Sequence, residues 1–329
     1  MRQRHWPNLR ELPGVALSCV SNSSVQSAKK FLVDISVSAE VVDKWENVID
    51  RSDVDVVWIA APPFLHKDAV IKSLRAGKAV FCQARMAKDL SEAEEMCAAR
   101  VQYPDVVAAF CPAPYGMSVA NYVKKILSED VLGHLIHLEF EALSDVYSDP
   151  AAPAHWRQRH EINGINFLSC GIFAEVIMDW LGEPLRISAV GQTIYKQRGP
   201  DKISLPDYAL VTAVWPEGFI GHLTWSGVHF GTHRPSLKIQ GTKACMMVLF
   251  EPDEIFLTTD RNSSPQKVHI PKECLSSWQV EKNFIDAVRG VAVKPGISFE
   301  EGLRYMRFTQ AVVDSIQKNG VWIHLRQQQ

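Results

Sequence analysis

The stretch VDVVWIAAPPFLHKDAVIKSLRAGKAVFCQARMA (54–87) decides the fold class. It opens with an apolar run, 54–63, which ends in two prolines, residues that cannot continue a central strand. A helical segment, 66–78, follows, and a second apolar run, 79–84, comes next. Strands that are apolar along their whole length are typical of parallel sheets buried on both faces. The stretch therefore predicts a strand–helix–strand unit with parallel strands.

The same alternation continues on both sides of this unit. Strand-like runs at 14–22 and 105–114 and helical segments at 23–34 and 91–103 surround it. Strands and helices that alternate at this spacing indicate a doubly wound α/β domain with a parallel sheet, as in nucleotide-binding proteins. We place this domain at residues 1–112.

The pattern changes after about residue 115. Helices are expected at 118–130, 166–182, 277–290 and 298–318, and strands at 134–144, 185–195, 208–216, 218–228, 236–250 and 254–260. Successive strands joined by short turns favour a mostly antiparallel sheet. We predict an α+β domain at 113–329 with a large open sheet, and leave open that helix 298–318 packs on the first domain.

Composition limits the classes of function. The 329 residues are 47% hydrophobic and 22% charged, with a net charge of -2, which is typical of a soluble globular protein with no preference for nucleic acid or anionic membranes. The chain contains no apolar run of the roughly 20 residues that span a bilayer. Its seven cysteines form no CxxC pair, so we expect reduced thiols in a cytoplasmic protein and no metal site.

Several short motifs, taken together in their order, resemble the Gfo/Idh/MocA family of oxidoreductases. The stretch 54–87 follows the family's strand, turn, His, helix, Gly-Lys and strand; SLKIQGTKACMMV (236–248) resembles its Gly-Thr-Lys-Gly hairpin, and NFIDAVRG (283–290) a closing helix. The resemblance covers nearly the whole chain. It implies a Rossmann domain that binds NAD or NADP, a second domain that binds a small, carbohydrate-like substrate, and a homodimer or homotetramer.

The chain departs from the family first at its beginning. A Rossmann domain opens with a strand and a Gly-x-Gly-x-x-Gly turn that approaches the cofactor pyrophosphate. Here the first residues, RQRHWPNLRELPG (2–14), resemble the helix that follows that turn. Two explanations stay open: a truncated sequence or misplaced start, or a chain that cannot hold a dinucleotide tightly. A missing central strand would leave sheet edges unpaired.

The second departure is in the turn after residue 82. The family usually has Glu-Lys-Pro there, with a lysine that assists proton transfer, whereas this chain has Gln83, Ala84 and Arg85. Alanine has no titratable group. Arg85 keeps its proton, so it is a candidate anion clamp or electrostatic stabiliser for substrate or catalysis, with a structural role as the alternative. Gln83 can hydrogen-bond a cofactor ribose or amide.

The third departure is in the expected helix 166–182. The family commonly has an Asp and, four residues later, a His on the same helix face. The matching residues here are Ser169 and Phe173, a poor base and an apolar side chain. Asn166, about one turn earlier, is a third candidate for substrate binding. Glu175 is expected to face elsewhere.

The segment AHWRQRH (154–160) resembles the family's Trp-Arg segment, which lies near the nicotinamide. Trp156 could stack on a ring and Arg157 could pair with a carboxylate or phosphate, so both are cofactor candidates. His155 and His160 are candidate proton shuttles. The alternative for all four is a cation-rich surface loop.

The remaining cofactor candidates follow the first two strands. Ala60, Pro62 and His66 occupy the family's turn beside the cofactor, where we expect His66 to shape the turn rather than to transfer protons. Ser21 and Asn22 stand where an acidic residue would bind the ribose hydroxyls of NAD. Neutral residues remove the repulsion of a ribose phosphate, so NADP is slightly favoured over NAD.

These residues and the resemblance leave two candidate functions. The first is an NAD(P)-dependent oxidoreductase that acts on a sugar-like or polyol substrate by hydride transfer, with the usual lysine and histidine replaced. The second is a catalytically inactive relative that binds a ligand or acts as a scaffold, because fold alone does not fix function.

Overall fold

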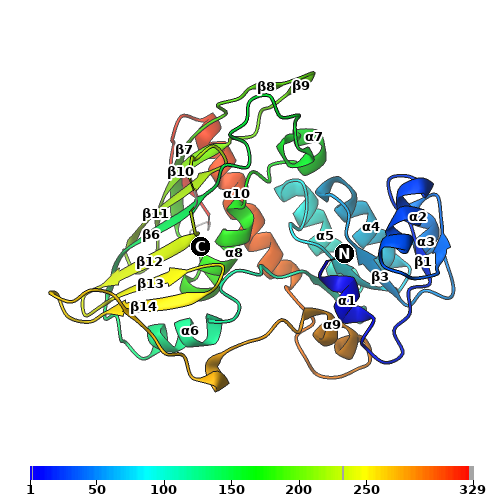
Figure 1. Cartoon of the computed structure of the whole chain (residues 1–329), viewed down its shortest axis with the longest axis horizontal. Coiled ribbons are helices and arrows are strands. Elements are labelled where there is room, and N and C mark those ends of the chain that lie inside the picture. The colour runs from blue at the N-terminus through cyan, green and yellow to red at the C-terminus, as the bar shows by residue number, and fades with distance from the viewer. Residues whose placement is uncertain (2, 232, 326–329) are drawn as a thin grey trace. The chain divides into compact units, whose positions relative to one another are not determined.

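The computed structural model describes residues 1, 3–231 and 233–325, and these form two compact units (Figure 1). The first unit comprises residues 1–87, 91–112 and 279–303. The second comprises residues 88–90, 113–278 and the C-terminal residues from 304. A segment late in the sequence, 279–303, is therefore part of the N-terminal unit.

The first unit alternates short strands with helices. Its strands are β1 (Cys19–Val20), β2 (Glu40–Val41), β3 (Val56–Ile59), β4 (Ala79–Cys82) and β5 (Ala108–Phe110). Its helices are α1 (His5–Leu9), α2 (Val25–Asp34), α3 (Trp45–Ile49), α4 (His66–Arg75), α5 (Leu90–Gln102) and α9 (Val280–Val288), with a 3-10 turn η1 (Pro63–Leu65); α10 (Phe299–Gln317) begins here and continues in the second unit. The strands pair in parallel, which confirms the predicted Rossmann-type class.

Packing on both faces explains why β3 and β4 are apolar throughout. All four residues of β4 are buried, and α4 packs against both strands. On β3 the ring of Trp58 stacks on Phe81 of β4 with centroids 4.0 Å apart, and Phe284 of α9 meets Phe81 edge-on at 5.1 Å. Burial of large aromatic side chains provides much of the stabilisation of such a core.

The parallel sheet of this unit is split. Strands β1 and β2 form one ladder and β3, β4 and β5 form another, with no ladder between β1 and β3 among the described residues. In the usual Rossmann strand order, 3-2-1-4-5-6, the first strand lies between the second and the fourth. The break therefore falls where the first strand of a Rossmann domain usually lies.

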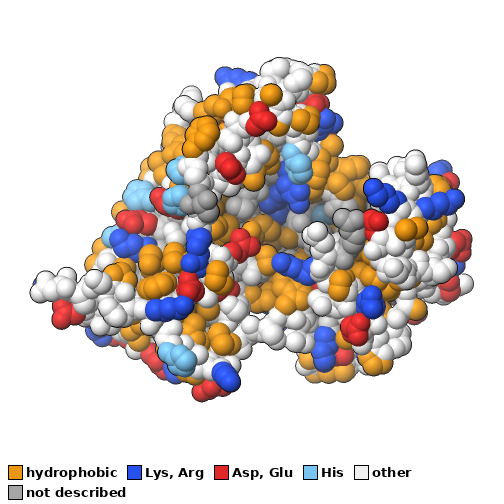
Figure 2. All heavy atoms as spheres, in the orientation of Figure 1, with side chains coloured by type: hydrophobic (Ala, Val, Ile, Leu, Met, Phe, Trp, Pro, Cys, Tyr) orange, Lys and Arg blue, Asp and Glu red, His pale blue; other side chains and the backbone are white. Residues whose placement is uncertain are grey.

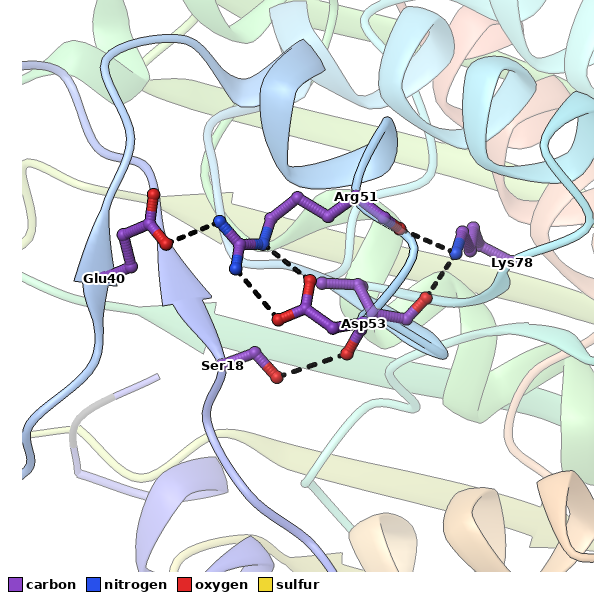
Figure 3. Close-up of polar contacts among 6 residues, drawn as sticks. Ser18, Glu40, Arg51, Asp53 and Lys78 are labelled. Carbon is purple, nitrogen blue, oxygen red and sulfur yellow. Dashed lines mark hydrogen bonds and ion pairs between the residues drawn. The ribbon is translucent and has the colours of Figure 1, made fainter.

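A cluster of polar residues links the two ladders at the amino ends of their strands (Figure 3). The Arg51 guanidinium binds both carboxylate oxygens of Asp53 at 2.8 Å each and contacts Glu40 of β2 at 2.6 Å. Ser18 donates to the Asp53 carbonyl at 3.5 Å, and Lys78 donates to the Arg51 carbonyl at 2.9 Å. The hydrogen bonds from Arg51 lower the pKa of Asp53. Side-chain contacts thus join the segments that backbone ladders leave apart.

The second unit is built on a nine-stranded sheet. Its strands lie in the order β15 (Gln266–Lys267), β14 (Glu254–Thr258), β13 (Cys245–Leu249), β12 (Ser236–Gly241), β6 (Leu135–Leu143), β11 (Ile220–Ser226), β10 (Tyr208–Val214), β7 (Arg186–Gln192) and β16 (Ile323–His324), with β8 (Gln197–Arg198) and β9 (Asp201–Lys202) as a separate hairpin. Every adjacent pair is antiparallel except β6 and β11. The predicted mostly antiparallel open sheet is confirmed.

One face of this sheet is covered by helices and the other is open. The other elements are α6 (Ala120–Ser128), α7 (His160–Asn163), α8 (Cys170–Leu181) and the 3-10 turns η2 (Trp156–Gln158) and η3 (Lys272–Cys274). Phe173 of α8 contacts Phe140 of β6, and Phe308 of α10 contacts Trp225 of β11. Along β12 and β13 burial alternates residue by residue, as expected when only one face is covered.

The helix predicted at 166–182 begins later than expected. It starts at Cys170, and Ser169 is its N-cap residue. Leu168 has φ +45°, a left-handed conformation that a helix cannot include. Asn166 therefore lies in the preceding turn and not in the helix.

Candidate functional site

The candidate cofactor site of the first unit is the edge where the parallel strands β3 and β4 end. The turn after β3 contains Ala60 and Pro62, and Pro62 caps η1. The turn after β4 contains Gln83, Ala84 and Arg85, and the peptide bond between the last two is cis. In doubly wound proteins ligands bind at the carboxyl ends of the strands. The structure thus brings four of the predicted residues, Ala60, Pro62, Gln83 and Arg85, to the expected edge.

His66 joins these two turns. Its ring is fully buried, with Nε2 2.8 Å from the Ala61 carbonyl and Nδ1 2.8 Å from the Arg85 carbonyl. Burial lowers the pKa of His66, and the hydrogen bonds to the carbonyls of Ala61 and Arg85 oppose this effect. A buried ring in this position can hold the two turns together, and this geometry supports the predicted turn-shaping role.

Gln83 is held by a side chain that the sequence analysis did not single out. Its Oε1 lies 3.2 Å from Nε2 of His5 on α1, and the other ring nitrogen of His5 lies 2.5 Å from Glu281 on α9. Both His5 and Glu281 are 1% exposed. More than 270 residues separate them in the sequence, so no local pattern could have revealed the pair.

Ser21 and Asn22 lie directly after β1, at the carboxyl end of that strand. The Asn22 side chain is exposed and accepts a hydrogen bond from the backbone of Ser23 at 2.8 Å. Ser24 caps α2 and accepts from the backbone of Ser27 at 3.1 Å. The turn is ordered by neutral groups, and its four residues 21–24 carry no carboxylate.

In the second unit, the segment 155–160 presents four predicted residues. The Arg157 guanidinium lies over the Trp156 ring at 4.1 Å, a cation–π contact. His155 caps η2 and accepts from the Arg157 backbone at 3.2 Å. Partial burial, and then the charge of Arg157, lowers the pKa of His155. His160 is exposed at the start of α7. The Trp156 face that Arg157 covers is therefore already occupied.

The turn between α7 and α8 buries two asparagines. The Asn166 amide donates to the Asn163 carbonyl at 2.7 Å, and the Asn163 amide donates back to the Asn166 carbonyl and to the Arg157 carbonyl, the latter at 2.8 Å. Both are fully buried. Asn163, which the sequence analysis missed, therefore links the turn to the segment with Arg157. Ser169, half-buried at the end of this turn, caps α8.

Phe173 lies in a cluster of aromatic side chains. It is 1% exposed and stacks on Tyr115 with centroids 4.5 Å apart, with Phe140 at 4.7 Å and Phe250 at 5.3 Å. Such a cluster stabilises the helix-covered face of the sheet. Its predicted contact with substrate stays a prediction.

Glu175 is engaged by the backbone. Its Oε1 accepts a hydrogen bond from the Ala113 amide at 2.7 Å. The structure thus gives this carboxylate a backbone partner within the second unit.

The residues present fit part of a dinucleotide site. The Gln83 amide nitrogen donates to no described residue, so it can serve a bound group. The carboxyl ends of β1 and β4 provide neutral polar side chains for an adenosine ribose and a nicotinamide. The 329 residues contain no Gly-x-Gly-x-x-Gly run to approach the pyrophosphate. The described residues contain no group of three His, Cys, Asp or Glu side chains placed to bind a metal ion.

Comparison with known protein families decides between the possible readings of this fold. Residues 1–110 match the model of an oxidoreductase family with an NAD-binding Rossmann fold. Residues 120–247 match the GFO/IDH/MocA C-terminal domain. The chain belongs to the Gfo/Idh/MocA family. The resemblance inferred from the motifs is confirmed, and the domain that the first unit represents is of the NAD-binding type.

Levoglucosan dehydrogenase resembles this chain in both sequence and structure. Levoglucosan dehydrogenase of Pseudarthrobacter phenanthrenivorans is 27% identical over 179 residues, which are 53% of this Gfo/Idh/MocA chain and 44% of that protein. Less than half of that relative's length is thus matched. A structure of levoglucosan dehydrogenase in complex with NADH and levoglucosan has a TM-score of 0.79 at 20% identity, over 94% of this chain and 90% of that one.

An inositol dehydrogenase homologue from Azotobacter vinelandii, in complex with NADH and myo-inositol, has a TM-score of 0.80 at 18% identity. It covers 94% of this chain and 90% of its own. These likenesses establish the shared fold.

Surface charge and hydropathy agree with the composition. Figure 2 shows acidic and basic side chains interspersed over the face in view, as a net charge of -2 suggests. Within the described part of the chain, no helix combines the length and the apolar character that a bilayer crossing requires.

Proposed function

We propose that this Gfo/Idh/MocA chain is an NAD(P)-dependent oxidoreductase that acts on a sugar-like or polyol substrate by hydride transfer, with the usual lysine and histidine replaced. One observation carries the proposal. The turns after β3 and β4 are tied together by His66 at the edge where doubly wound proteins bind ligands, and Gln83 offers an unused amide group there.

The residues of the first unit would bind and orient the cofactor. A nicotinamide dinucleotide supplies hydride transfer when it is bound. Gln83 would hydrogen-bond its nicotinamide end, Ala60 and Pro62 would pack beside it, and Ser21 and Asn22 would contact the adenosine ribose. In the second unit Trp156 and Arg157 are the other proposed cofactor contacts, Trp156 through its ring and Arg157 through pairing with a phosphate.

Proton transfer must use other groups than the lysine and the histidine that the family commonly has. Ala84 cannot titrate and Phe173 is apolar, so Arg85, His155 and His160 are the catalytic candidates. The lowered pKa of His155 keeps its ring neutral near neutral pH, and a neutral ring can accept a proton. General acid–base help contributes about 10²–10⁴-fold, so a site that lacks the lysine can still be a slow enzyme.

The proposed substrate class rests on the polar side chains of the candidate site and on the ligands bound by structurally similar proteins. Levoglucosan and myo-inositol, bound in two structurally similar proteins, carry several hydroxyl groups. We propose that Arg85, Asn166, Ser169 and Phe173 contact a molecule of that class. Arg85 would then favour a substrate with a negative charge or a strongly accepting oxygen.

Cofactor titration tests the proposal. We expect saturable quenching or enhancement of fluorescence with both NADPH and NADH, with tighter binding of NADPH because residues 21–24 carry no carboxylate. Asn22→Asp, nearly isosteric, introduces a charge that repels a ribose phosphate. It should weaken NADPH about tenfold, a difference of about 1.4 kcal/mol, and spare NADH. An Asn22→Ser control should leave the ratio unchanged.

Absence of binding with both reduced cofactors would refute the enzyme proposal. It would favour the second candidate, a catalytically inactive family member that binds a ligand or acts as a scaffold. The observation that favours this candidate is the loss of titratable groups at Ala84 and Phe173, with the latter buried in an aromatic cluster.

We also propose a homodimer or homotetramer through the open face of the nine-stranded sheet. Lys238, Met247 and Phe256 lie side by side across β12, β13 and β14 and line a shallow hollow on that face. Met247→Lys should lower the mass measured by light scattering to that of a monomer, because a second ammonium group beside Lys238 would oppose burial. Val33→Lys, a change of an exposed residue on α2, is the control. A monomeric parent protein would contradict this prediction.

A cytoplasmic location is proposed on the chemistry of the cysteines. All seven are free thiols, as expected for a protein in a reducing compartment.

A further inference from the structure

A network of hydrogen bonds from two helices, α1 and α9, reaches the Gln83 side chain at the end of β4. Glu281 of α9 accepts at one carboxylate oxygen from His5, at 2.5 Å, and at the other from Asn8, at 2.9 Å. Nε2 of His5 then meets Oε1 of Gln83 at 3.2 Å. These four residues all belong to the first unit. A chain of contacts thus runs from Glu281 through His5 to the end of β4.

The surroundings fix the His5 ring. It lies 5.1 Å from the Trp58 ring and 5.8 Å from the Phe81 ring, on the aromatic face of the sheet. Its contact with Glu281 helps to satisfy a buried carboxylate, a group that is costly to bury without hydrogen bonds. The separation of 2.5 Å between Nδ1 of His5 and Oε1 of Glu281 shows a direct hydrogen bond between them.

The two ring nitrogens of His5 face different partners. Nδ1 faces a carboxylate oxygen of Glu281, and Nε2 faces the amide oxygen of Gln83. With Oε1 of Gln83 engaged in this way, its amide nitrogen has no hydrogen-bond partner among the described residues.

We propose that His5 and Glu281 are positioning residues that fix the Gln83 amide as a hydrogen-bond donor at the carboxyl end of β4. The group bound there is then an acceptor, such as the carboxamide oxygen or a ribose oxygen of a nicotinamide dinucleotide. The identity of this ligand rests on the proposed function, whereas the positioning of Gln83 by His5 and Glu281 does not. A glutamate at residue 83 would instead present an acceptor, so the substitution seen here reverses what the site recognises.

Nitrogen NMR of the labelled full chain tests the positioning without any cofactor. Glu281→Gln keeps the shape of the side chain and removes the charge that His5 contacts, so the side-chain amide signals of Gln83 should shift. Asp286→Asn is the control, because Asp286 lies on the same helix and pairs with Lys282 instead. Gln83 signals that are indifferent to Glu281→Gln would overturn the positioning.

Titration with NADH and NADPH tests the ligand. Either cofactor should move the Gln83 amide signals of the parent protein, and Glu281→Gln should weaken binding about tenfold, as expected from one disordered hydrogen-bond donor. Glu281→Asp should recover part of the loss. Binding that leaves the Gln83 signals unmoved would overturn the assigned acceptor. If neither cofactor binds, both the proposed function and the assigned ligand are contradicted. The His5 and Gln83 signals of the parent and variant proteins still test whether His5 and Glu281 position Gln83.

Discussion

Replacing Gly164 with alanine is expected to destabilise the second unit by about 3 kcal/mol or more. Gly164 has φ +60° and ψ -136°, a region that side chains essentially do not populate. A Cβ there would lie 2.0 Å from the Lys88 carbonyl oxygen, a backbone atom that cannot move aside cheaply. The neighbouring amide of Ile165 donates to the same oxygen at 2.8 Å, so the clash would also break this link.

Thermal unfolding, followed by tryptophan fluorescence, measures the effect as a midpoint lowered by about 6 °C. Gly182→Ala is the matched control, since Gly182 also has a positive φ, +73°, but its added Cβ would meet nothing within 4 Å. We expect a clearly smaller loss there, so the difference between the two variants reports the backbone contact. Equal losses would show that conformation alone, and not the approach of Lys88, requires Gly164.

Replacing His66 with alanine is the second change with a large expected effect. Two carbonyl oxygens, of Ala61 and Arg85, lose their shared partner inside the protein, and a cavity replaces the ring. Leaving buried polar groups unpaired costs about 1–3 kcal/mol, so we expect a total loss of about 3 kcal/mol in the free energy of unfolding. His66→Gln should lose less because its amide can still donate to one or both carbonyls. His160→Ala, at an exposed histidine, should change little.

The same residue gives the protein a dependence of stability on pH. The unfolded imidazole has a pKa near 6.5, and burial lowers the pKa of folded His66. Between these two values the unfolded chain binds a proton that the folded chain does not, so stability falls as the pH drops below about 6.5 and stops changing below the folded pKa. Above about 6.5 the contribution is constant.

Urea unfolding at about pH 7 and about pH 5.5 measures this effect, with a slope of at most about 1.4 kcal/mol per pH unit from one histidine. The His66→Gln variant should lose less stability over this interval than the parent protein. An equal loss in both proteins would assign the acid sensitivity to other groups.

The sequence predicted the architecture because the fold depends on local patterns. Burial on both faces of a parallel sheet explains the fully apolar runs at β3 and β4 on either side of a helix. This pattern can be recognised in a stretch of about 30 residues. The start of α8 could not be predicted, because the segment 165–169, in which Ile165, Phe167 and Leu168 are apolar, suits a helix as well as a buried turn. It is the left-handed Leu168 and the Asn163–Asn166 pair that end the turn there, and these depend on tertiary contacts.

The candidate site was predicted only in part, for a physical reason. Residues 60–66 and 83–85 were found because they follow strands, and strand ends meet at one edge of a parallel sheet. His5 and Glu281 were missed because a histidine near the start and a glutamate in a late helix carry no signal until folding places them 2.5 Å apart. Asn163 was missed because buried asparagines are read as exposed turn residues.

The arrangement of the nine-stranded sheet has a consequence for the order in which it can assemble. Its middle strand, β6, is the first of the nine to leave the ribosome, yet its two neighbours, β11 and β12, follow 77 or more residues later, as the gap from Leu143 to Ile220 requires. Strand pairs so distant along the chain are slow to form. The intervening chain must first close into a long loop, which costs conformational entropy before any hydrogen bond between the strands forms. We therefore expect β6 to wait unpaired during synthesis, exposed to chaperones, until the hairpins on either side arrive.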